Sequence, residues 1–173
     1  AYLDRWRTRF ELFDPERPFL QYPELAGRKD APTLAVLLPS ISSGNAVTLF
    51  SHACERDRIA LTPAAAARGL VHVALKGGEY GVLGARVAML GQDLRETLVA
   101  NLPRYLGANE DGIPAWERDR PRSLPSAPRT PTEVPRGLLD FATWQWRAVL
   151  LRPPVDGLVR SCVYGHGPRP AGE

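Results

Sequence analysis

The 173-residue chain is long enough for one domain with a core of its own, and short for two. Hydrophobic residues make up 44% and charged residues 24% of the sequence, which is typical of a globular protein. The sequence contains no apolar run of membrane-spanning length and no signal-peptide pattern, so we expect no membrane partner.

Arginine supplies almost all of the positive charge. Lys29 and Lys76 are the only lysines among 22 basic residues, which leaves 20 arginines, and the formal net charge is +3. The guanidinium group binds phosphate oxygens with two hydrogen bonds, which suits an acidic partner, although a coding bias explains the arginines equally well. Cys54 and Cys162 make no disulfide framework, so we expect a reducing, cytoplasmic location.

Apolar spacing and proline positions predict the first elements. Residues 2–13 show the three- and four-residue spacing of a helix that ends at Asp14-Pro15. The apolar stripe of this helix consists of Leu3, Trp6, Phe10 and Phe13. Prolines favour an extended course for residues 15–23, and residues 34–38 are predicted as a short helix closed by a proline.

The next helix has the clearest boundary signals in the sequence. Thr62 is a good N-cap, Pro63 suits the first helical position, and four alanines follow. We expect this helix to run through Ala74 and to stop at Gly77-Gly78, where glycine adopts a left-handed cap. A strand is predicted over residues 85–90, after a glycine-rich loop.

Asp93 and Glu96 predict the start of another helix, because their three-residue spacing matches a capping box. The apolar face of this helix is formed by Leu94, Leu98 and Leu102. Residues 107–135 hold six prolines and few core residues. We interpret them as a long surface connection pinned by Trp116.

A long helix and a hairpin are the last predicted elements. Residues 136–150 carry apolar residues at helical spacing. The inward-facing set of this helix is Leu138, Leu139, Ala142, Trp146 and Leu150. The pair Asp156-Gly157 favours a tight turn into a strand over residues 158–164. The tail from Gly165 lacks core residues, so we expect it to be frayed.

These elements predict an α+β fold of mainly helices with a few short strands, in one domain. The apolar stripes also predict which side chains form the core. The predicted core residues are Trp6, Phe10, Phe13, Leu70, Leu98, Leu102, Leu139 and Trp146.

Signals for catalysis, metal binding and cofactors are weak in this sequence. Cys162 and His166 are four residues apart, but a zinc site needs about four ligands and no second pair has ligand spacing. Ser51, His52 and Asp57 have the residue types of a hydrolytic triad. The signal is weak, because no glycine-framed nucleophile elbow surrounds the serine. We therefore expect no catalytic residue, no metal and no cofactor.

Two loops are candidate nucleic-acid-binding segments. The first places an aromatic ring near arginines, a combination that stacks on a splayed base and holds phosphates; a core aromatic with solvated charges is the competing interpretation. The candidate residues of the first loop are Phe50, Ser51, His52, Arg56 and Arg58. The second loop is rich in glycine, which either caps the preceding helix or lets the backbone approach a ligand. Its candidate residues are Lys76, Gly77, Gly78 and Gly81.

Several segments together resemble CasA, the family of large subunits of the type I-E CRISPR Cascade, an RNA-guided surveillance complex. The resemblance rests on ELFDPERPFLQ (11–21), LLPSISSGNAVTLFSH (37–52), LTPAAAARGLV (61–71), the glycine-rich loop (77–84), DLRETLVANLP (93–103), PAWERD (114–119) and PRGLLDFATWQWRAVLL (135–151). These segments follow one another in order along nearly the whole chain. The chain resembles the middle of a larger CasA-like N-terminal domain.

The resemblance implies a non-catalytic role in an antiviral complex. Its expected partners are other Cascade subunits, the 5′ end of the guide RNA, target double-stranded DNA and the helicase–nuclease. By position, residues 50–59 match the family's loop for docking the RNA end, and residues 76–84 match its glycine loop at the motif that flanks the target (PAM). In RNA-guided effectors, base pairing reads the sequence while protein reads this short motif.

Departures from the family pattern leave a second class of function open. The family's lysine finger and duplex wedge are expected beyond residue 173, and Glu79 places a negative charge where phosphate would be repelled. A structural scaffold that packs against other subunits without touching nucleic acid is the main alternative. A hydrolase that uses Ser51 and His52 is the weaker third possibility.

Overall fold

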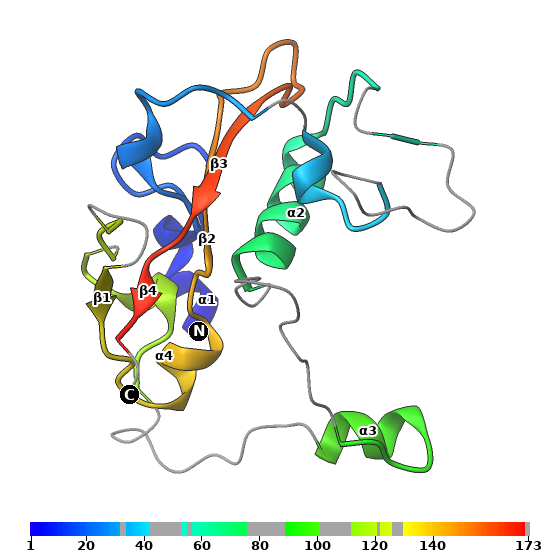
Figure 1. The fold of residues 1–173 in the computed structure, drawn as a ribbon, viewed down its shortest axis with the longest axis vertical. Coiled ribbons are helices and arrows are strands. Elements are labelled where there is room, and N and C mark those ends of the chain that lie inside the picture. Colours follow the sequence, from blue (N-terminus) through cyan, green and yellow to red (C-terminus); the bar gives the residue numbers. More distant parts are fainter. Residues whose placement is uncertain are drawn as a thin grey trace.

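The computed structural model describes residues 1–31, 34–41, 53–54, 57–75, 89–100, 112–120, 122–125 and 130–171. These residues form short helices and short strands around an antiparallel hairpin (Figure 1). The predicted α+β class is therefore confirmed. The helices predicted over residues 2–13 and 136–150 are shorter than the sequence suggested, and more of these segments packs through irregular structure.

The central hairpin consists of β2 (Arg147–Leu151) and β3 (Cys162–His166), with Arg147 opposite His166 and Leu151 opposite Cys162. Asp156 and Gly157 turn the chain between them, with φ angles of 51° and 74°. Two positive φ angles are the signature of a type I′ turn, as the Asp-Gly pair predicted. The backbones of Val155 and Leu158 close this turn by reciprocal hydrogen bonds of 2.9 and 3.0 Å.

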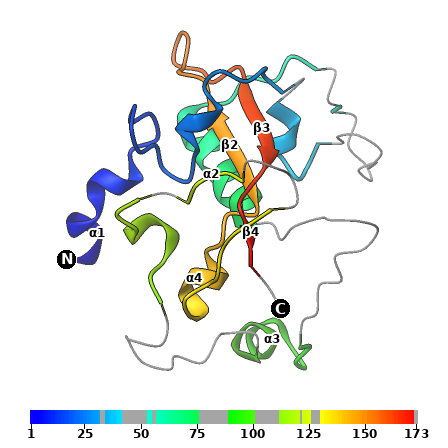
Figure 2. The same ribbon diagram turned by 60° about the vertical axis from the view of Figure 1, so that its left-hand side comes forward.

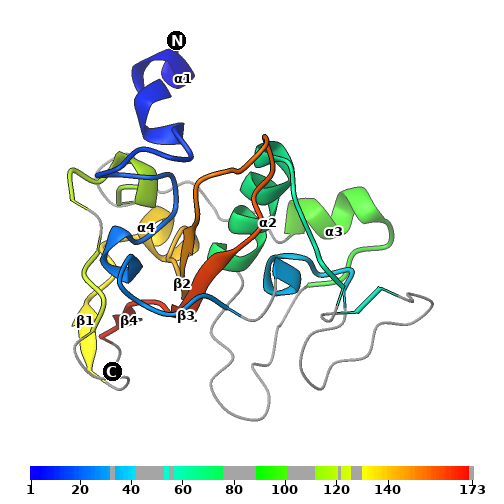
Figure 3. The ribbon, with the colours of Figure 1, turned by 90° about the horizontal axis from the view of Figure 1, so that it is seen from above.

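Residues 165–171 of the tail are held by backbone pairing, so the prediction of a frayed end was wrong for these residues. Gly167 donates its backbone N–H to the Trp146 carbonyl at 3.1 Å. The chain then enters β4 (Arg169–Pro170), which pairs in parallel with β1 (Pro131–Glu133). Figure 3 shows β1 and β4 side by side at one edge of the molecule. The tail is held by backbone pairing with residues far away in the sequence. No local apolar pattern predicts such pairing, so the sequence analysis missed it.

The helix with the clearest boundary signals in the sequence is present as α2 (Pro63–Leu75). The Thr62 hydroxyl accepts the backbone N–H of Ala65 at 3.3 Å, as an N-cap should. Ala66, Leu70 and Val73 of α2 are buried in a core cluster that also contains Val149 and Val159. Helix α2 lies against β2 (Figure 2). The prediction for this helix is confirmed from Thr62 through Ala74, while its predicted stop at Gly77-Gly78 lies outside the described residues.

The predicted helix over residues 2–13 is broken into α1 (Tyr2–Arg5) and the 3₁₀ turn η1 (Arg7–Phe10). Trp6 separates them, with φ of −103° and ψ of 8°. Two further 3₁₀ turns follow, η2 (Pro23–Leu25) and η3 (Leu34–Leu37). The last of these stands where the sequence predicted a short helix.

The predicted helix over residues 136–150 was wrong. The chain forms only α4 (Leu138–Ala142) and then changes to strand β2. Trp146 donates its backbone N–H to the Ala74 carbonyl at the end of α2, at 3.1 Å, and β2 pairs with β3. These long-range bonds replace the i to i−4 bonds that a helix would need.

The helix predicted from Asp93 is present as α3 (Leu94–Ala100), away from the hairpin in Figure 1. Asp93 accepts the backbone N–H of Glu96 at 2.7 Å, so its capping role is confirmed. The apolar face of α3 is exposed, however, with Leu98 at 60%. The strand predicted over residues 85–90 is described only at Met89 and Leu90, which lie in no strand.

Two apolar clusters form the core around the hairpin. The larger joins η3, α2 and the inner side of the hairpin, and the smaller joins Tyr22 and Leu25 to Ala148 and Val163. Of the predicted core residues, Leu70 is fully buried and Leu98 is exposed, while Leu102 lies outside the described residues. The half-buried ones are Trp6, Phe10, Phe13, Leu139 and Trp146. Trp144, two residues before the predicted tryptophan, is the one that is completely buried.

Candidate nucleic-acid interface

Most of the predicted interface residues lie outside the described part of the chain. They are Phe50, Ser51, His52, Arg56, Lys76, Gly77, Gly78 and Gly81. Arg58 is the exception, and its side chain is exposed. The structure therefore describes the segments next to the two predicted loops. The nucleic-acid-binding role of the loops remains a prediction.

A tight turn holds Arg58 on the surface. The Asp57 carboxylate accepts the backbone N–H of Cys54 at 2.9 Å, and the Asp57 N–H donates to the Cys54 carbonyl at 3.1 Å. After the turn, Leu61 exchanges backbone hydrogen bonds of 2.8 and 2.9 Å with Val159 on the arm of the hairpin.

Helix α2 is the covalent link between the two predicted loops. The first loop ends just before the Thr62 cap, and the second begins at residue 76, directly after α2. The 13 residues of α2 span about 20 Å, at 1.5 Å per residue.

Close packing fixes α2 against its neighbours. A Cβ atom on Gly69 would stand 2.9 Å from both Cβ and the carbonyl oxygen of Leu37, so only glycine allows η3 to approach this closely. At the other end, the Ala74 carbonyl accepts the N–H of Trp146. The helix is thus attached to η3 and to the segment that enters β2.

The Cys162–His166 pair does not form a metal site. Both residues lie on β3, four residues apart, so their backbones are separated by about 13 Å. Cys162 is buried, and burial raises the pKa of its thiol to about 12, which disfavours the thiolate that binds metals. Burial and the neighbouring charges of Arg147 and Arg169 lower the pKa of His166. No group of three or more possible metal ligands occurs among the described residues.

A buried charged cluster, which we call the Asp140 cluster, was missed by the sequence analysis. Asp140 is completely buried, and its two carboxylate oxygens pair with the guanidinium groups of Arg118 and Arg122. The backbone N–H of Arg136 also donates to Asp140, at 2.9 Å. Glu133 Oε2 lies 3.0 Å from Arg118 Nη1. Three of these residues come from the segment that was interpreted as a surface connection.

Arg122 is only 2% exposed and stacks on the buried Trp144 ring, with its central carbon 3.7 Å from the ring centroid. Trp144 is itself held by a hydrogen bond from Nε1 to the Pro168 carbonyl, at 2.8 Å. Burial, followed by the charge of Arg118, lowers the pKa of Arg122 to about 10. At neutral pH this arginine therefore still carries its charge.

No described helix is long and apolar enough to cross a membrane. The described geometry thus consists of a surface turn with Arg58, a fixed helix between two predicted loops, and the Asp140 cluster.

Comparison with known proteins identifies the family. The family model for CRISPR-associated protein Cse1 matches residues 1–173. The chain is 40% identical over 184 aligned residues to a CRISPR-associated protein CasA/Cse1 of Thermus thermophilus, covering 98% of the chain and 36% of that protein. It therefore spans about a third of the length of this relative.

Solved structures give the same result. A CRISPR-associated protein from Thermus thermophilus matches 98% of the chain and 35% of its own, with 36% identity and a TM-score of 0.63. Cse1 of Acidimicrobium ferrooxidans matches 98% of the chain and 36% of its own, with 32% identity and a TM-score of 0.59. A chain of a CRISPR RNA-guided surveillance complex matches the whole length, and 38% of its own, with 26% identity and a TM-score of 0.65. The chain belongs to the CRISPR-associated Cse1 (CasA) family.

Proposed function

We propose that this chain acts as part of the large subunit of an RNA-guided surveillance complex and has no catalytic step of its own. Within that complex it docks the 5′ end of the guide RNA and contributes to reading the flanking motif (PAM) in double-stranded DNA. It also contributes to recruiting the helicase–nuclease. The two predicted loops carry the first two roles, through residues 50–58 and 76–81.

Two comparisons carry the proposal. The Cse1 family model matches every residue of the chain, and 100% of this chain matches 38% of a chain of a surveillance complex. The described structure supports it in a specific way. Helix α2, about 20 Å long, lies in the sequence between the two predicted loops, and Arg58 is exposed at the end of the first. Two contact sites joined by a fixed helix suit a protein that touches RNA and DNA at once.

The glycine loop is tested by placing a side chain in it. In the assembled complex, Gly78→Asp should lower the affinity for target DNA at least about tenfold, or about 1.4 kcal/mol, because it adds bulk and negative charge where backbone approaches a groove about 6 Å wide. Guide RNA should stay bound. DNA affinity and thermal stability are measured on the same preparations.

Gly77→Ala is the matched control, since a capping glycine and a DNA-contacting glycine respond differently. If Gly77 and Gly78 only end α2, alanine should cost about 1 kcal/mol of stability and leave DNA affinity unchanged in the folded complex. If both variants keep the target-DNA affinity of the unchanged complex and have a lowered melting temperature, the glycine loop does not contribute to DNA binding.

The first loop is tested by the assembly of the complex. Phe50→Ala and Arg58→Ala should each reduce the fraction of subunit that co-purifies with the RNA-bearing complex, because a stacking ring or a phosphate contact is lost. Arg28→Ala removes an exposed arginine near η2 and serves as the charge-matched control. Normal incorporation of both loop variants would favour the structural scaffold over RNA docking.

A further inference from the structure

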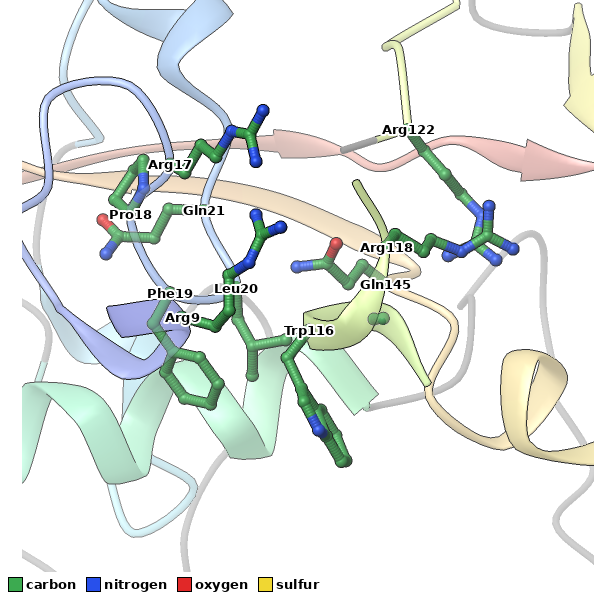
Figure 4. Close-up of a pocket in the computed structure, with 11 residues that line it drawn as sticks. Arg9, Arg17, Pro18, Phe19, Leu20, Gln21, Trp116, Arg118, Arg122 and Gln145 are labelled. Atoms are coloured by element: carbon green, nitrogen blue, oxygen red, sulfur yellow. The ribbon is translucent and has the colours of Figure 1, made fainter. Parts of the chain in front are cut away.

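The pocket in Figure 4 is lined in part by Arg118 and Arg122, and the charges of both arginines are already used inside the protein. Both guanidinium groups pair with Asp140 and Glu133. Their charges therefore join residues 118–122 to residues 133–140 and stabilise the fold. The feature that bears on function lies elsewhere, at the contact between α2 and η3.

Gly69 lies where α2 packs against η3, and it is buried. A Cβ atom added at this position would stand 2.9 Å from the Cβ atom and 2.9 Å from the carbonyl oxygen of Leu37. One of these atoms is part of the η3 backbone and the other is bonded to it, so neither can turn aside as the end of a long side chain does. A side chain at position 69 therefore requires η3 and α2 to move apart.

The hairpin holds α2 more firmly than its neighbours hold η3, so η3 is the element that we expect to move. Leu70 and Val73 of α2 are buried in one cluster with Val149 and Val159, and the Ala74 carbonyl accepts the N–H of Trp146. By contrast, η3 is a single four-residue turn. A shift of η3 changes its position relative to a fixed α2.

The position of η3 matters because the chain continues from it into the segment with the first predicted loop. After η3, the N–H of Ile41 donates to the Leu38 carbonyl at 3.2 Å, and residues 42–58 follow. The other end of this segment is fixed where Leu61 pairs with Val159 and the chain enters α2. The spacing between η3 and α2 thus sets how far apart the two ends of the segment are held.

We propose that Gly69 is a positioning residue for guide-RNA docking: its lack of a side chain lets η3 sit against α2 and so places the segment that carries Phe50 and Arg58. The inference rests on the proposed RNA-docking role of the first loop. Because Gly69 is buried, it acts through η3 and not by touching RNA.

Gly69→Ala is the test, made in the full-length protein. Alanine is the better helix residue, which offsets part of the cost of overpacking, so we expect a folded variant with a melting temperature close to that of the unchanged protein. Its affinity for the RNA-bearing complex assembled without this subunit should fall about tenfold, because binding groups must be held to within about 0.5 Å. Biolayer interferometry gives the affinity, and circular dichroism gives the fold and the melting temperature.

Two matched variants separate positioning from stability. Gly27→Ala places a Cβ where no atom lies within 4 Å, so stability and affinity should both stay unchanged. Leu70→Ala removes atoms from the core next to Gly69 and adds none between α2 and η3. It should lower the melting temperature more than Gly69→Ala does. At a temperature where it is folded, it should keep its affinity for the RNA-bearing complex within about twofold.

The outcomes distinguish this inference from the proposed function. If Phe50→Ala and Arg58→Ala bind the RNA-bearing complex normally, the RNA-docking role is wrong and the role of Gly69 is wrong with it. If those two variants lose affinity while Gly69→Ala keeps it, only the positioning role is overturned. A Gly69→Ala variant that loses stability and affinity together, as far as Leu70→Ala or further, would make Gly69 a packing residue alone.

Discussion

Replacing Asp140 by alanine is expected to lower the free energy of unfolding by about 3–5 kcal/mol. The carboxylate is completely buried and pairs with both Arg118 and Arg122. Its removal leaves Arg122 as a buried charge whose main partner is gone, and the backbone N–H of Arg136 loses its acceptor as well. Urea unfolding, with midpoint and slope measured together, gives the change in stability.

Asp119→Ala is the matched control for this experiment. Asp119 also lies near an arginine, Arg9, but its carboxylate is fully exposed, so solvent screens the pair and the unfolding midpoint should stay where it is. Equal midpoints for the two variants would mean that the Asp140 cluster contributes nothing to stability.

Replacing Leu70 by alanine should destabilise the protein by about 2–5 kcal/mol. Leu70 is completely buried on the inner face of α2 and packs in the larger core cluster with Leu37, Val149 and Val159. Truncation removes buried apolar atoms and leaves a cavity, because η3 and the hairpin are fixed by backbone hydrogen bonds and cannot collapse freely. Thermal and urea unfolding both report the loss.

Leu98→Ala is the matched control for Leu70→Ala. Both leucines were predicted as core residues, yet Leu98 is 60% exposed on α3. An exposed leucine in a helix changes stability by no more than about 0.5 kcal/mol on replacement by alanine. A loss of several kcal/mol in Leu98→Ala would contradict the exposure of α3.

Elements with local signals were the ones that the sequence predicted well. Thr62 and Pro63 start α2 through bonds and angles within one helical turn, and Asp156-Gly157 turns the hairpin through its own φ angles. Asp93 caps α3 in the same local way. Each of these signals acts within a few residues, so no knowledge of distant partners is needed to read it.

Elements fixed by distant partners were predicted badly. Residues 136–150 have helical apolar spacing, but β3 and the Ala74 carbonyl recruit Trp146 and β2 into extended structure. Tertiary pairing outweighs a local preference that is worth tenths of a kcal/mol per residue. The predicted burial of Trp146 assumed helical spacing through residue 150. Because the helix ends at Ala142, Trp144 is buried in place of Trp146.

The Asp140 cluster had no readable signal in the sequence. A proline-rich segment with several arginines is normally a solvated connection, and charged side chains are rarely buried unless paired. The partner of Arg122 is 18 residues away, at Asp140, and its stacking ring is Trp144. Only the fold shows that these groups meet.

The way in which the N-terminal segment joins the hairpin also bears on how the chain folds while it is being synthesised. The Gln21 side chain accepts the N–H of Leu151, 130 residues later, and Tyr22 donates its N–H to the Val149 carbonyl. At about 5–20 residues per second, a ribosome needs roughly 6–26 s to add those 130 residues. During that interval Tyr22, Leu25, Leu34 and Leu37 have no strand to cover them. Nascent chains of this protein should therefore be substrates for ribosome-associated chaperones until β2 (Arg147–Leu151) has been synthesised.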